Sequence, residues 1–271
     1  MGILFDAGDG ISAGLLQKSH KIKHVFISHP DRDHLGGLLQ FNQLNARPDF
    51  PVIYYPKDSG SFPALRDFQH KFDPHVQLAR WEAIIDGSEI EIKKNVQVKA
   101  IRNEHIACET GIHKSLSFKV FESRRKLKAE FQGLQEQEIK AIVQSKGRDF
   151  LTQEIKRNVI SYSGDTPVDD YGKWDKSEIL IHEATFLQPE NDAAIESRGH
   201  KHSRIDEVFN MLAEIEVGSL ILSHFSSRYS KEQIQASIRK MCKSFQIQIP
   251  VYAIYPGQIH HNILQEEALN A

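Results

Sequence analysis

The chain has 271 residues, of which 40% are hydrophobic and 26% are charged, and its formal net charge is −2. This composition is typical of a soluble globular protein that is long enough to bury a large core without cross-links. The nearly balanced charge excludes a protein that binds nucleic acid through an overall basic excess, so such binding would require a local basic patch.

Two further observations concern the cellular setting. Two cysteines, Cys108 and Cys242, are too few for a disulfide framework, which favours a reducing environment. No stretch approaches the ~18 apolar residues that span a bilayer, and the first ten residues lack the basic and apolar regions of a signal peptide. We therefore expect a cytoplasmic protein without membrane contact.

Apolar runs alternate with helical patterns along the whole chain. Residues 89–101 and 115–122 show the alternation of antiparallel strands, whereas residues 124–157 are rich in Lys, Glu and Gln and predict helix plus loops. This order favours one layered α/β domain over residues 1–271, with ligands beyond the carboxyl ends of the strands. Further strands are expected at 3–6, 24–28, 52–56, 159–165, 179–184, 219–225 and 251–257, and helices at 11–19, 35–44, 63–72, 204–215 and 231–245.

A dense group of metal-ligand side chains follows the strand predicted at 24–28. His29, Asp31, Asp33 and His34 lie within six residues, and a tight turn after a strand can direct several of them into one pocket. Imidazole and carboxylate groups suit zinc, iron or manganese. The segment therefore predicts a metal site; the alternative is a polar loop with capping aspartates.

Several motifs, in order from about Leu4 to Tyr229, resemble the metallo-β-lactamase superfamily and, within it, ribonuclease Z. The resemblance implies an αββα sandwich, N-terminally shortened because family members usually have two or more strands before residues 3–6. The motifs are the HxHxDH-like segment 29–34, a stretch at 124–134 like one in short ribonuclease Z-like hydrolases, the strand-end aspartate of 161–166, the HEAT-like segment 181–187, the HST-like segment 200–207 and the last histidine segment 220–229.

The resemblance implies a centre with two divalent metal ions, zinc being expected and manganese or iron being the alternatives. Asp6 would lie behind the ligands and orient them. His105 is preferred to the nearby His113 because it directly follows the strand-like run 95–104. The implied ligands are His29, Asp31 and His105 for one metal, Asp33, His34 and His224 for the other, and Asp165 between the two.

The same resemblance implies hydrolysis of a phosphodiester, with RNA as a substrate class. Asp33 would act as general base, and His202, oriented by Glu183, would give a proton to the leaving oxygen. Ser203 and Arg228 would contact the substrate. His182 is expected to be structural and His200 to be an exposed loop residue.

The chain departs from the ribonuclease Z pattern at two places. Asp31 replaces a histidine, which is expected to shift the first site toward manganese or iron or to weaken its binding of zinc; the alternative is a degenerate, single-metal homologue. Residues 124–157 contain two glycines and no proline, so a short charged helical insertion is expected in place of the RNA-binding arm. Open alternatives are hydrolysis of a lactone, thioester or sulfate ester, and a binding protein that has lost its metals. A homodimer is expected.

Overall fold

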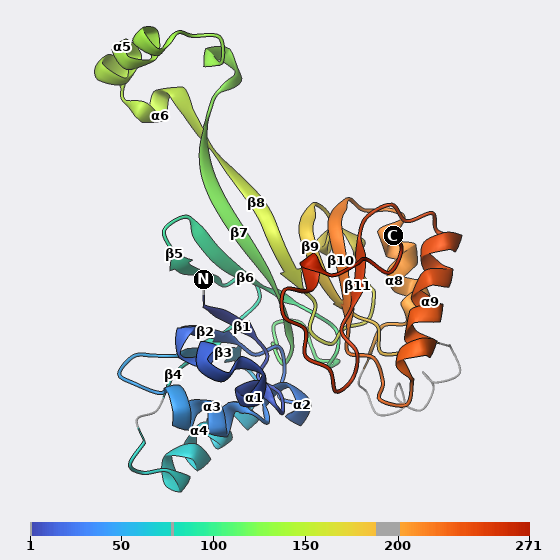
Figure 1. The fold of residues 1–271 in the computed structure, drawn as a ribbon. Coiled ribbons are helices and arrows are strands. Elements are labelled where there is room, and N and C mark those ends of the chain that lie inside the picture. Colours follow the sequence, from blue (N-terminus) through green and yellow to red (C-terminus); the bar gives the residue numbers. More distant parts are fainter. Residues whose placement is uncertain (1, 77–78, 188–200) are drawn as a thin grey trace.

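The computed structural model describes residues 2–76, 79–187 and 201–271, and it consists of two β-sheets packed face to face with helices on both outer sides (Figure 1). The smaller sheet has the order β1-β2-β3-β4 and is parallel throughout. Its strands are β1 (Ile3–Phe5), β2 (His24–Phe26), β3 (Val52–Pro56) and β4 (Arg80–Ile84).

The larger sheet has seven strands in the order β11-β10-β9-β8-β7-β6-β5. The strands from β5 to β8 are antiparallel to their neighbours, whereas those from β8 to β11 are parallel. Its strands are β5 (Glu89–Lys93), β6 (Val96–Arg102), β7 (Leu116–Leu127), β8 (Thr152–Tyr162), β9 (Ser177–Glu183), β10 (Val217–Ser223) and β11 (Val251–Ala253).

Three apolar clusters hold the layers together. Phe26, Phe118 and their neighbours fill the space between the sheets, and two further clusters lie between each sheet and its outer helices. This arrangement confirms the expected αββα sandwich. The outer helices are α1 (Ile11–Leu15), η1 (Leu16–Lys21), α3 (Leu38–Asn45) and α4 (Ser61–Phe72) on one side, and α8 (Ile205–Leu212) and α9 (Lys231–Ser244) on the other.

Short helices complete the described elements. α2 (Arg32–Leu35) lies in the turn after β2, and the 3-10 turns η3 (Tyr171–Lys173) and η5 (Ile263–Gln265) lie in connections. Among the described residues, none of the helices is long and apolar enough to cross a bilayer.

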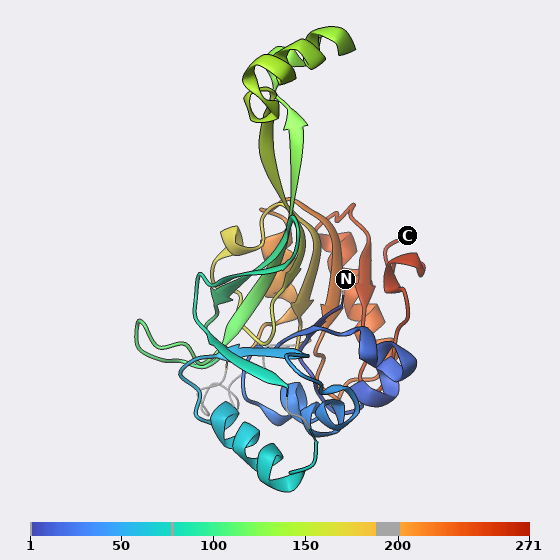
Figure 2. The same cartoon turned by 90° about the vertical axis from the view of Figure 1, so that its left-hand side faces the viewer.

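Residues 124–157 differ from the expected short helical cover. Beyond the sandwich, β7 and β8 continue as a two-stranded hairpin that pairs from Arg124↔Ile155 to Leu127↔Thr152. Figures 1 and 2 both show this hairpin projecting from the body, with helices only at its tip. The tip consists of η2 (Ala129–Phe131), α5 (Glu136–Lys146) and α6 (Arg148–Leu151). We call residues 124–157 the arm.

The physical reason for the difference is that the arm strands pair with each other and not with the core. Arg124, Arg125 and Lys126 are all exposed, so this part of β7 has no apolar face to give the period-two signal of a half-buried strand. The tip is closed by contact between the rings of Phe131 and Phe150, whose centres are 5.6 Å apart.

Candidate metal centre

The strand ends opposite the arm bring polar side chains from distant parts of the sequence together. His29 follows β2, Asp165 follows β8, Glu183 ends β9 and His224 follows β10. Gly37 lets the turn after β2 pack closely, because a Cβ at that position would lie 2.3 Å from the carbonyl oxygen of Gly8. Polar side chains were expected to lie together beyond the carboxyl ends of the strands, and the structure places them there.

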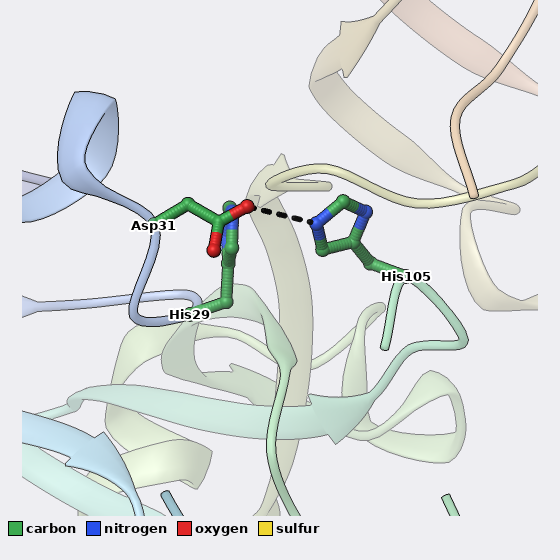
Figure 3. A group of neighbouring side chains, drawn as sticks. All are labelled: His29, Asp31 and His105. Carbon is green, nitrogen blue, oxygen red and sulfur yellow. Dashed lines mark ion pairs between the residues drawn. The ribbon is translucent and has the colours of Figure 1, made fainter. Parts of the chain in front are cut away.

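The first group of ligand-type side chains consists of His29, Asp31 and His105 (Figure 3). Oδ2 of Asp31 lies 3.6 Å from Nε2 of His29 and 3.7 Å from Nε2 of His105. Both imidazoles are fully buried, and the Asp31 side chain is 36% exposed. The carboxylate that replaces the family's histidine thus points into the same space as the two rings.

The second group consists of Asp33, His34 and His224. Nε2 of His224 lies 3.3 Å from both Oδ2 of Asp33 and Nε2 of His34. His224 has a φ of 58°, a region that non-glycine residues seldom adopt, so the loop after β10 keeps a strained backbone at this candidate ligand.

Asp165 lies between the two groups. Its Oδ2 is 3.2 Å from Nε2 of His34, 3.3 Å from Nε2 of His224 and 3.7 Å from Nε2 of His29. The preceding residue, Gly164, has a φ of 57°, and a Cβ on it would lie 2.7 Å from Cβ of Ser28. Glycine at this position therefore lets β8 approach the turn after β2 closely.

Each of the four histidines in these groups has its Nδ1 atom tied to a group behind it. His34 Nδ1 lies 2.7 Å from Oδ2 of Asp6, and His105 Nδ1 lies 2.8 Å from the carbonyl oxygen of Lys201. His29 Nδ1 lies 2.9 Å from the Ser28 hydroxyl, and His224 Nδ1 lies 2.9 Å from the Thr185 hydroxyl. Nδ1 anchoring of this kind leaves Nε2 as the nitrogen that faces a metal.

The spacing of the donor atoms fits metal ions better than hydrogen bonds. Nε2 of His29 and Oδ1 of Asp165 are buried without a hydrogen-bond partner. Ligand atoms about 2.0 Å from a tetrahedral zinc ion lie about 3.3 Å from one another, and the separations around Asp165 Oδ2 are 3.2–3.7 Å. These residues therefore fit divalent metal ions with nitrogen and oxygen ligands.

The carboxylates of the cluster also favour positive charge on the neighbouring side chains. Burial alone would lower the pKa of His34, but the carboxylates of Asp6 and Asp165 outweigh burial and raise the pKa to about 12. Burial alone would also lower the pKa of His224, but Asp165 and Asp33 outweigh burial and raise the pKa to about 9. Both shifts indicate that the surrounding carboxylates favour positive charge here, and a divalent cation would supply that charge.

A second polar unit adjoins the centre. Nδ1 of His202 lies 3.1 Å from Oε1 of Glu183 and 3.7 Å from Oδ2 of Asp165. Glu183 is 1% exposed, and its carboxylate also accepts from the Thr166 N–H at 2.6 Å and from the Thr185 hydroxyl at 2.6 Å. Glu183 is thus a buried carboxylate held by several hydrogen bonds and in contact with the His202 ring.

Ser203, Arg228 and His113 have other contacts in the structure. Ser203 is fully buried and its hydroxyl donates to the Thr166 carbonyl oxygen at 2.5 Å, so its expected contact with substrate is replaced by an internal hydrogen bond. Arg228 donates from Nε to the Ser226 hydroxyl at 2.9 Å, and its substrate contact stays a prediction. His113 faces the Asp86 N–H instead of the centre.

Two other histidines were singled out in the sequence. His182 is fully buried, with its ring edge-on to Trp174, which agrees with a structural role. His200 lies outside the described residues.

Four supporting groups were not found from the sequence: the hydroxyls of Ser28, Thr185 and Tyr162, and the carbonyl of Lys201. Asp6 accepts from the Ser28 hydroxyl at 2.8 Å and from the Tyr162 hydroxyl at 2.6 Å, in addition to its contact with His34. Only their positions in the sequence could have indicated the first two groups, because Ser28 directly precedes His29 and Thr185 lies inside the HEAT-like segment. A backbone carbonyl leaves no signal in the sequence.

Comparison with known proteins places these features in a family. Residues 2–225 match the family model described as the beta-lactamase superfamily domain. Ribonuclease Z of Ignicoccus hospitalis is 30% identical over 84% of this chain and 80% of that protein. tRNase Z TRZ1 of Arabidopsis thaliana is 29% identical over 79% of this chain and 76% of that protein.

Solved structures share the fold. Human tRNase Z, short form, superposes with a TM-score of 0.57 at 21% identity, over 96% of this chain and 87% of that chain. The metallo-beta-lactamase fold protein YhfI from Bacillus subtilis gives a TM-score of 0.59 at 14% identity, over 96% and 87%. At these identities the structural likeness concerns the arrangement of the layers.

Proposed function

We propose a function from one premise: the chain belongs to the beta-lactamase superfamily and is a ribonuclease Z-like, metal-dependent hydrolase. The proposed reaction is the hydrolysis of phosphodiester bonds in RNA. Precursor transfer RNA is the first substrate to test, because the relatives that match most of the chain are named tRNase Z or ribonuclease Z.

Two divalent metal ions are proposed at the strand ends, with zinc as the expected metal and manganese or iron as alternatives. When bound, such ions supply an activated water and positive charge that stabilises the phosphoryl oxygens during displacement. The proposed ligands are His29, Asp31 and His105 for one ion, Asp33, His34 and His224 for the other, and Asp165 between them.

The chain's own side chains would then move the protons. The Asp33 side chain is 65% exposed, and its carboxylate is the proposed acceptor of a proton from the attacking water. His202 would donate a proton to the leaving ribose oxygen. Glu183 holds Nδ1 of His202, which leaves Nε2 for the substrate.

The observation that carries the proposal is the His202–Glu183 pair beside Asp165. An alkoxide leaves poorly unless a proton reaches it in the transition state, and a positioned acid contributes about 10²–10⁴-fold to such a step. The pair would supply this acid, since Nδ1 of His202 lies 3.7 Å from Oδ2 of Asp165.

The arm supports RNA as the substrate class. Residues 124–157 carry nine basic and five acidic side chains, a local excess of four positive charges in a chain of net charge −2. Some of the basic groups are paired, such as Arg125 with Asp149 and Lys140 with Glu136. The exposed Lys126, Arg148 and Lys156 have no ion pair within 4 Å in the described part of the chain, and they can contact phosphates.

The proposal is tested with protein reconstituted with zinc, manganese or iron. Each form is assayed on bis-p-nitrophenyl phosphate, on a lactone and on a precursor transfer RNA. We expect both phosphodiesters to be cleaved and the lactone to remain intact. Lactone opening without diester cleavage would assign the chain to a different hydrolase class, and metal binding without any turnover would contradict the proposed function.

Neutralising the arm should weaken RNA binding specifically. In the variant K126Q/R148Q/K156Q we expect a higher KM for precursor transfer RNA and unchanged turnover of bis-p-nitrophenyl phosphate. The slope of log K against log salt should fall by up to about 0.9 for each lost phosphate contact. Binding titrations at several salt concentrations measure both quantities.

A matched variant on α9, R239Q/K240Q/K243Q, removes the same number of exposed positive charges elsewhere. It should behave like the wild type. Equal weakening in both variants would show that only the overall charge matters and not the arm.

Restoring the family's histidine at position 31 should change the metal preference. In Asp31→His the imidazole replaces an oxygen ligand beside His29 and His105, and imidazole suits zinc better than it suits manganese. We expect zinc to gain about tenfold over manganese, a difference of about 1.4 kcal/mol. Competition with a chelator and elemental analysis of the dialysed protein measure the effect.

The exposed Asp67 on α4 provides the control, because Asp67→His adds a histidine away from the cluster. Wild-type protein with one metal per chain and Asp31→His with two would instead support a single-metal homologue.

The expected homodimer and cytoplasmic location stay predictions, and sedimentation of the purified chain tests the first of them.

A further inference from the structure

Thr185 lies at the junction between the proton-donating pair and the proposed metal ligands. It follows the end of β9 by two residues and is 6% exposed. Its hydroxyl lies 2.6 Å from Oε2 of Glu183, 2.9 Å from Nδ1 of His224 and 3.3 Å from Nδ1 of His202. One hydroxyl group therefore contacts three side chains of the site.

The hydrogen atoms in this junction have one consistent arrangement. A threonine hydroxyl donates once and accepts through two lone pairs, whereas a carboxylate only accepts. Glu183 also receives the N–H groups of Thr166 and Thr185, so the Thr185 hydroxyl donates to Glu183 and accepts from the ring of His224. Nδ1 of His224 then carries the proton, and its Nε2 is left to face Asp33 and Asp165.

The backbone of Thr185 is held independently of its hydroxyl. The Thr185 carbonyl oxygen accepts from the Ser226 N–H at 3.1 Å, and the neighbouring Ala184 N–H donates to the Ser223 carbonyl oxygen at 2.9 Å. β9 and the loop that carries His224 thus remain joined when the hydroxyl is removed. A side-chain substitution can therefore test the hydroxyl without displacing the loop.

We propose that Thr185 is a positioning residue that couples the proton donor to the metal centre, because its hydroxyl sets Glu183 and His224 at the same time. This inference rests on the proposed function, in which His202 donates a proton and His224 binds metal. It adds a consequence that neither role has alone: a single hydroxyl should influence both metal retention and protonation of the leaving group.

Thr185→Val and Thr185→Ser separate the hydroxyl from the shape of the side chain. Valine keeps the volume and removes the hydroxyl, whereas serine keeps the hydroxyl. Zinc retention is measured by competition with a chelator. Leaving-group dependence is measured as the ratio of RNA cleavage, which needs a proton for the leaving oxygen, to cleavage of bis-p-nitrophenyl phosphate, whose p-nitrophenolate leaves without one.

We expect Thr185→Val to show both defects. Zinc affinity should fall by about 10–100-fold, the usual effect of removing a group that orients a ligand. The RNA-to-diester ratio, measured at saturating zinc, should fall as well. Thr185→Ser should recover both. His202→Ala should lower only the ratio, and His224→Ala should lower zinc affinity as its main effect.

The exposed Thr110 provides the control, because Thr110→Val makes the same change away from these contacts. Thr185→Val with wild-type zinc affinity, with a wild-type ratio, or with defects that serine does not recover would overturn the coupling. The zinc measurement does not depend on catalysis. A wild-type chain that cleaves neither diester would therefore refute the proposed function, whereas normal zinc retention in Thr185→Val would refute this inference.

Discussion

Asp165→Asn is expected to lose at least one metal ion per chain and to reduce phosphodiester cleavage by about 10³–10⁴-fold. The reason is the position of Asp165 Oδ2, which lies 3.2–3.7 Å from the Nε2 atoms of three histidines. An amide removes the negative charge from that point. Loss of an ion removes several kcal/mol of transition-state stabilisation, and each 1.36 kcal/mol corresponds to about tenfold in rate.

Elemental analysis after dialysis and kcat on bis-p-nitrophenyl phosphate measure the two effects. Asp170→Asn is the matched control, because Asp170 is exposed and caps η3 through the Gly172 N–H, a bond that asparagine can also accept. An Asp165→Asn protein that retains both metals and its activity would contradict a bridging role for this residue.

His202→Ala is expected to lower RNA cleavage by about 10²–10⁴-fold while metal content stays unchanged. The His202 ring contacts Glu183 through Nδ1, and it is not needed to complete either proposed ligand set. Cleavage of bis-p-nitrophenyl phosphate should fall much less, because p-nitrophenolate leaves without a proton. Single-turnover rates on both substrates give the comparison.

The exposed His70 on α4 serves as the control, and His70→Ala should cleave both substrates at the wild-type rate. Equal loss on both substrates in His202→Ala, or loss of metal from that variant, would assign His202 to metal binding. The structure places His202 in a group with His105 and Asp165, so metal analysis of this variant decides between the two roles.

Local patterns in the sequence predicted a layered α/β domain with candidate ligands at the strand ends. Strand ends are followed by His29, Asp165 and His224, and parallel strands bring such ends to one edge. His105 was preferred to His113 for the same reason, and the structure places His105 in the cluster. Contacts through the backbone or through short hydroxyl groups were missed, since serine and threonine occur in every kind of loop.

Burial explains the two clearest differences from the sequence-based expectations. Ser203 matches a motif position, but only the packed structure shows that its hydroxyl is turned inward to Thr166. The arm was expected to be helix plus loops because it is charged and rich in Lys, Glu and Gln, and its exposed charged residues give no strand pattern. Its strands owe their stability to pairing with each other, and such pairing between distant segments is not a local property of either one.

The length of β8 sets the distance between the arm tip and the proposed metal centre. β8 runs from Thr152 at the arm tip to Tyr162, three residues before Asp165. At about 3.3 Å per residue, its ten steps span about 33 Å. An RNA long enough to reach both ends would be held at two points, so its second contact forms at a high effective concentration. If the arm binds RNA as proposed, fragments too short to reach it would lose this second contact, whatever their sequence.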